Sequence, residues 1–120
     1  MIVTMQGSTS IAANASNSGI LTGQKYERPP FQAIGTLYIT GSATGLFAEI
    51  NVDGLAVSDE VTVGAQNRVP VIPDDLLIAG WEAPMGGLIQ LKVRNSTGGA
   101  LTTFWKILLE AAELGGQPAY

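Results

Sequence analysis

The sequence predicts an all-β protein, an antiparallel β-sandwich with an extended N-terminal arm. Apolar and polar residues alternate along residues 46–52, 89–94 and 101–110, and this period of two places successive side chains on opposite faces of a sheet. Turn-forming residues recur about every 8–12 positions, which is typical of antiparallel sandwiches and not of alternating strands and helices. Both observations favour two stacked sheets.

The chain length and the distribution of small polar residues predict one folded domain with two flanking segments. With 120 residues the chain is long enough to bury a two-sheet core without disulfides. We expect an N-terminal arm and entry segment over residues 1–32, a β-sandwich domain over 33–110, and a C-terminal tail over 111–120. Residues 7–24 are mostly small and polar, so they bury too little apolar surface to order themselves.

Two interpretations of the N-terminal arm remain open. It is either a flexible tail or a segment that becomes ordered by lying on a neighbouring subunit. In the second case the anchors are the occasional apolar residues of the arm, namely Ile2, Val3, Ile11, Ile20 and Leu21.

The first half of the sandwich is predicted as short strands separated by tight turns. Residues 33–40 are rich in β-branched and aromatic residues and precede a turn at 41–45, after which 46–52 alternates. Asp53-Gly54 is the strongest hairpin signal in the chain, because both residues tolerate the positive φ that a two-residue turn requires.

The middle of the chain is predicted as one further strand and an irregular crossing. Residues 58–63 indicate a short strand, and 65–73 an extended crossing, since its prolines cannot donate to a central ladder. Residues 74–81 are interpreted as a strand or a short turn that ends near Gly80.

Residues 88–110 are predicted to form a long β-hairpin. Its turn lies at residues 95–100, where Asn and two Gly residues supply turn conformations. The second arm is apolar on both faces, with Trp105 on one face and Phe104 and Leu108 on the other. Such a strand is either central in a two-layer stack or covered by another subunit.

The residue types exclude several kinds of chemistry. The chain has no Cys and no His, so disulfides, thiolate or imidazole metal ligands and His-based nucleophilic catalysis are impossible. The adjacent acids at 59–60 and 74–75 are interpreted as solvated turn residues, because neighbours on a strand point to opposite faces. An enzyme would need Glu49, Asp53 and the 59–60 pair to converge. We therefore expect no enzymatic activity, no metal and no cofactor.

The composition indicates a surface that is partly buried in contacts. Charged residues make up 13% of the chain, about half of the ~25% that is usual for soluble domains. The six basic residues are scattered, so we expect no nucleic-acid partner. The sequence has no apolar run of about 18 residues and no basic start before an apolar core, so we expect no membrane span and no secretory signal.

Four features of the chain are similar to those of a known protein family. They are the polar turn at 95–100, the aromatic and aliphatic last strand, the crossing at 67–73 and the Ser/Ala/Asn-rich arm. The chain resembles small single-domain jelly-roll or related β-sandwich virion proteins of bacteriophages over about residues 33–110. The resemblance implies a jelly-roll-like sandwich that serves as a capsid, vertex or decoration subunit. It implies a location in the virion after synthesis in the host cytoplasm, and it assigns no role to any single residue.

These observations predict a non-enzymatic viral structural protein that assembles with copies of itself, as a trimer or pentamer, and packs on other virion proteins. We expect a neighbour to cover the reverse face of the last strand. The expected interface residues are Phe104, Leu108, Lys106, Ile11, Ile20 and Leu21. The alternative is a carbohydrate-binding module of a phage fibre or bacterial surface protein, in which Trp81 in a loop displays the aromatic ring.

Overall fold

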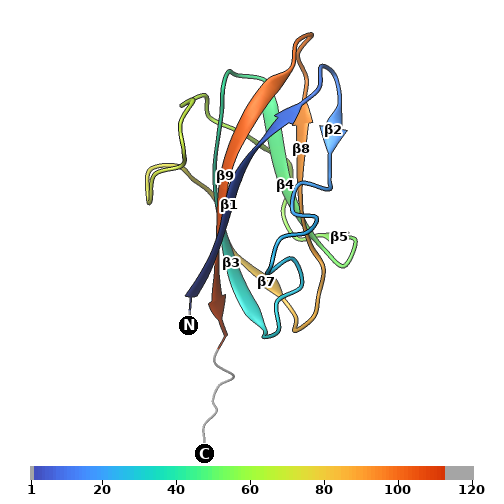
Figure 1. Cartoon of the computed structure of the whole chain (residues 1–120), viewed down its shortest axis with the longest axis vertical. Coiled ribbons are helices and arrows are strands. Elements are labelled where there is room, and N and C mark those ends of the chain that lie inside the picture. Colours follow the sequence, from blue (N-terminus) through green and yellow to red (C-terminus); the bar gives the residue numbers. More distant parts are fainter. Residues whose placement is uncertain (1, 113–120) are drawn as a thin grey trace, which may run out of the picture.

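The computed structural model describes residues 2–112, which form nine strands and no helix. The strands make two antiparallel sheets packed face to face (Figure 1). The four-stranded sheet has the order β1 (Ile2–Ile11), β9 (Leu101–Ala111), β3 (Ala33–Gly41) and β7 (Leu76–Ala83). The second sheet has the order β2 (Ser16–Asn17), β8 (Ile89–Asn95), β4 (Leu46–Val52) and β5 (Leu55–Ala56), and β6 (Val61–Thr62) also pairs with β4. The predicted all-β sandwich is confirmed.

The core lies between the sheets and contains the residues that alternation assigned to it. On β8 Ile89, Leu91 and Val93 are fully buried, and on β9 Ile107 and Leu109 are fully buried as well. Removing such side chains from water is the main favourable term in folding. The alternating pattern therefore predicts the correct buried face of each of these strands.

The turn at Asp53-Gly54 has the predicted geometry. Its φ angles are 53° and 83°, and Val52 pairs with Leu55 on the next strand. Positive φ at both central positions defines the turn whose twist matches that of an antiparallel pair. The predicted hairpin is confirmed.

The predicted hairpin over residues 88–110 is wrong. Strands β8 and β9 belong to different sheets, so the segment between them crosses the end of the sandwich. The buried Asn95 secures the crossing, because its amide nitrogen donates to the Ile11 carbonyl at 3.1 Å and to the Gly99 carbonyl at 2.8 Å. Strand β9 lies between β1 and β3, which confirms that it is central in its sheet.

The expected arm over residues 1–32 requires a correction. Residues 2–11 are an integral strand, paired with β9 from Ile2 opposite Glu110 to Ile11 opposite Leu101, and β2 pairs with β8. Backbone hydrogen bonds do not require apolar side chains, so a polar segment joins a sheet when a neighbour offers a free edge. Residues 113–120 of the expected tail lie outside the described residues.

The strand pairs are nested in sequence. Strand β1 pairs with β9, β2 with β8, β3 with β7, and β4 with β5. This is the pairing of one long antiparallel ribbon. The ribbon is folded over on itself, which brings β3 beside β9 and β4 beside β8. The fold thereby places β1 and β9 along the length of one face of the molecule (Figure 1).

Candidate functional site

The outer face of the five-stranded sheet is charged and solvated. Lys92 lies 3.5 Å from Glu49, and Arg94 makes two hydrogen bonds with Glu60 at 2.9 and 3.0 Å. The Arg94 guanidinium also lies 4.5 Å from the centre of the Phe47 ring. Arg94 lowers the pKa of Glu60 through these hydrogen bonds. Ion pairs of this kind are stable in contact with water. This face therefore does not need another protein to cover it.

The outer face of the four-stranded sheet combines the apolar Phe104 and Leu108 with the charged Lys106, Glu82 and Glu110. The register places Ser8 beside Phe104, Gln6 beside Lys106 and Thr4 beside Leu108. Phe104, Lys106 and Leu108 are each partly exposed. Phe104 and Leu108 flank Lys106 on this strand, and neighbouring exposed apolar side chains mark surfaces that bind another molecule.

The segment at residues 64–75 covers the β3 side of this face. The Thr40 hydroxyl donates to the Arg68 carbonyl at 2.6 Å, and Thr40 and Tyr38 are buried. Arg68 donates to both carboxylate oxygens of Asp75 at 3.1 and 3.2 Å, and the Val71 N–H donates to Asp75 at 2.7 Å. The hydrogen bonds from Arg68 and Val71 hold the pKa of Asp75 below its usual value. The ion pair thereby ties residues 68 and 75 of the segment together, and the Thr40–Arg68 hydrogen bond joins the segment to β3.

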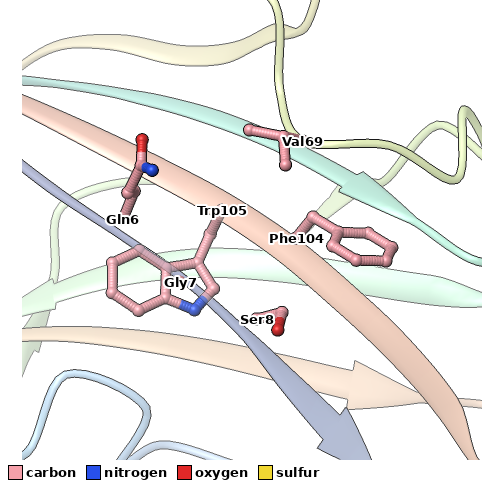
Figure 2. A pocket seen from close by; sticks show the side chains of 6 residues that line it. All are labelled: Gln6, Gly7, Ser8, Val69, Phe104 and Trp105. Atoms are coloured by element: carbon pink, nitrogen blue, oxygen red, sulfur yellow. The ribbon is translucent and has the colours of Figure 1, made fainter.

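A hollow of about 240 Å³ lies where this segment meets β1 and β9. Figure 2 shows the six residues that line it, namely Gln6, Gly7, Ser8, Val69, Phe104 and Trp105. The indole of Trp105 lies against Gly7, where a Cβ atom would come within 2.9 Å of the ring. None of the six residues carries a charge, so the hollow is suited to apolar and hydrogen-bonded contacts and not to acid–base chemistry.

The structure brings three of the predicted interface residues together and separates the other three from them. Phe104, Lys106 and Leu108 lie in one row on the outer face of β9. The other three, Ile11, Ile20 and Leu21, are in the protein's own core. Their expected role as anchors on a neighbour is therefore wrong, because a side chain shielded inside its own chain has no surface to offer another.

Sequence reasoning missed Val69 as a member of this surface. Val69 is 58% exposed and borders the hollow beside Phe104. Its position depends on how residues 64–75 fold over the sheet, and no local sequence pattern indicates that contact.

Trp81 is not displayed in a loop. It lies on β7, is 4% exposed and packs against Gly35, which has no side chain to obstruct the ring. Within residues 2–112, no three His, Cys, Asp or Glu residues are grouped so that they could hold a metal ion.

No protein-family model and no curated protein matches this chain. The described residues contain no helix that is long and apolar enough to cross a membrane.

Proposed function

We propose that the protein is a non-enzymatic structural subunit of a virus particle, a capsid, vertex or decoration protein that assembles with copies of itself. The observation that carries the proposal is the outer face of the four-stranded sheet, where Phe104 and Leu108 stay partly exposed on the central strand β9. The opposite outer face holds the Lys92–Glu49 and Arg94–Glu60 pairs. The partly exposed Phe104 and Leu108 favour the face of the four-stranded sheet as the contact surface, with Lys106 between them.

The nested strand pairing supports a jelly-roll interpretation of the sandwich. When β5 and β6 are counted as one step, the first strand pairs with the eighth, the second with the seventh, the third with the sixth and the fourth with the fifth. Jelly rolls occur in viral capsids, lectins and cupins. Because one fold serves several functions, the choice among them depends on the surface. The partly exposed apolar side chains of Phe104 and Leu108 favour a shell subunit.

The carbohydrate-binding alternative is less well supported. It depended on an aromatic side chain displayed in a loop, and the burial of Trp81 removes that residue. Phe104 is partly exposed, and it shares its strand face with Leu108 and its hollow with Val69, Gln6 and Ser8. The aliphatic Leu108 and Val69 favour a protein contact.

The proposal is tested by truncating an aromatic residue on each outer face. Phe104→Ala should weaken self-association by about 1–3 kcal/mol, because a partly buried aromatic anchor is lost. Phe47→Ala on the charged face is the matched control and should leave self-association unchanged. The readouts are molar mass by light scattering over a dilution series and the thermal unfolding midpoint of each variant. Equal self-association of both variants and the wild type would remove the support from this face.

A further inference from the structure

The two sheets have edges that differ in how well they are protected. An edge strand presents unpaired backbone N–H and C=O groups, which pair readily with a further strand. Proteins prevent this with very short edge strands, charged side chains, prolines or bulges. A long edge that has none of these devices is therefore open to pairing with another strand.

Three of the four edges in the described part of the chain are protected. The second sheet ends in β2 on one side and in β5 and β6 on the other, and each of these strands has two residues. In the first sheet, the β7 edge shifts register against β3 at Gly35/Thr36 and again at Leu37/Tyr38. Strand β7 also carries the exposed Glu82.

The fourth edge, β1, has no such protection. It contains ten residues, Ile2–Ile11, with neither a charge nor a proline among them. Its pairing with β9 is regular over all ten positions. No other segment of residues 2–112 pairs with β1. At about 3.4 Å per residue the open edge is roughly 34 Å long.

We propose that β1 binds β1 of a second copy of this chain in antiparallel register, which joins two four-stranded sheets into one continuous sheet around a twofold axis. This inference rests on the proposed function and deepens it, because it names a partner and a surface for self-assembly. The surface is the sheet edge, whereas Phe104 and Leu108 belong to the sheet face.

The alternation of faces restricts the register of this pairing. Opposed residues in an antiparallel pair lie on the same face, and the even-numbered residues of β1 lie on the outer face. One residue of β1 must therefore lie next to the twofold axis, opposite the same residue of the second copy. With Gln6 on the axis, Thr4 meets Ser8 of the second copy. With Gly7 on the axis, Gln6 meets Ser8.

The charge distribution favours a second copy as the occupant. Either register places only uncharged residues opposite each other along the edge. The nearest ionisable side chains are Lys106, beside Gln6, and Glu110, beside Ile2, and both lie one strand further in. Across four strands the two copies of Lys106 are about 14 Å apart, which exceeds the Debye length of about 8 Å in physiological salt. Like-charge repulsion does not oppose the pairing.

Cysteine cross-linking tests the geometry directly, because the chain has no cysteine of its own. A disulfide needs Cα atoms about 4.4–6.8 Å apart, so it forms only between residues that are nearly opposite. Two oxidised samples are compared on a denaturing gel, Gln6→Cys alone and an equal mixture of Gln6→Cys with Ser8→Cys. We expect a reducible dimer from Gln6→Cys alone in the first register, and a mixed dimer, recognised by its mass, in the second.

Thr36→Cys is the matched control, because Thr36 lies on the same outer face but on β3, away from the edge. It should form no cross-link through the edge. Dimers from Thr36→Cys without dimers at residues 6 and 8 would overturn edge pairing while leaving self-assembly through the face intact. An absence of all cross-links together with a monomeric mass would overturn both.

A second variant tests the edge without oxidation. Gln6→Lys places a positive charge on the edge near its twin in the second copy, and we expect the dissociation constant of the dimer to rise at least tenfold. Gln6→Thr is the neutral control and should pair as the wild type does. Equal dissociation constants for the two variants, with unchanged thermal unfolding, would contradict the proposal.

Discussion

At the scale of single residues, two glycines in strands are explained by the tryptophan rings that lie on them. Gly35 faces Trp81 across the β3–β7 pair, and Gly7 faces Trp105 across the β1–β9 pair. Glycine weakens a strand interior unless something approaches the backbone closely. Both indoles occupy the space that a Cβ atom would take, so the ring and the glycine form one packing unit.

The Gly35–Trp81 contact predicts that Gly35→Ala overpacks the core. A Cβ atom at residue 35 would overlap the indole of Trp81, which is buried and cannot move aside freely. We expect the free energy of unfolding to fall by about 1–3 kcal/mol, as measured by chemical denaturation. Gly64→Ala is the control, since a Cβ atom there meets nothing within 4 Å. Equal stabilities for the two variants would disprove the close contact.

The Arg68–Asp75 pair predicts how stability depends on pH. Hydrogen bonds from Arg68 and Val71 lower the pKa of Asp75 in the folded protein. The stabilisation is therefore complete above the pKa of the unfolded chain, about 3.9, and is lost as the pH falls toward the lower folded value. The Asp75→Asn variant should lose less stability between pH 5 and pH 2 than the wild type, as judged by thermal unfolding. Asp59→Asn, at an exposed position, should follow the wild type, and identical profiles for all three proteins would refute the assignment.

At the scale of the elements, the sequence predicts which residues form strands much better than which strands pair. Alternation over 89–94 and 101–110 assigned the buried faces correctly. The same buried residues are compatible both with a hairpin and with a crossing between two sheets, so alternation does not decide which strands pair. The Asp53-Gly54 turn was predictable because its geometry is local to two residues with positive φ. The crossing after Asn95 depends on a contact with Ile11, which is distant in sequence.

Strand β1 was not predictable from its own residues for a related reason. Its core-facing side chains include Met5 and Ile11, but a glycine, Gly7, interrupts that apolar row. What holds the segment is the edge that β9 provides, and β9 follows about 90 residues later in the chain. The pattern of apolar and polar residues over a short stretch of sequence does not indicate a pairing partner that is so distant in the chain.

Asn95 is expected to be the most important polar residue of the sheet crossing. The Asn95→Ala change removes two hydrogen bonds to the carbonyls of Ile11 and Gly99. It also removes a side-chain oxygen that accepts from the Thr97 N–H at 2.9 Å. We expect a loss of about 1–3 kcal/mol in the free energy of unfolding, because buried polar groups lose their partners.

The neighbouring Ser96 provides the control for this change. Its hydroxyl donates to the Gly45 carbonyl at an exposed position, where water replaces the lost bond. Ser96→Ala should therefore change the stability by less than about 0.5 kcal/mol. If urea denaturation found the two variants equally stable, the buried amide would not be what secures the crossing.

At the scale of the whole molecule, the surface divides into a sheet face with paired charges, a sheet face on which Phe104 and Leu108 are partly exposed, and one open edge. The low charge content of the sequence predicts that part of the surface is covered, which stays a prediction, and alternation along 101–110 correctly placed Phe104 and Leu108 on the outer face. The assignment of Ile11, Ile20 and Leu21 to the same surface failed, because apolar residues in a polar segment look alike whether they face the chain's own core or a neighbour. The contributions of Val69 and of the β1 edge to the surface can be recognised only in the folded structure.

The most direct test of self-assembly is the molar mass of the purified full chain in solution. Sedimentation velocity or light scattering over a wide concentration range measures it without any substitution. The protein is expected to form a discrete oligomer of the 120-residue chain, whose mass falls toward that of one chain on dilution. A single species with the mass of one chain at every concentration, including the highest attainable, would contradict the account.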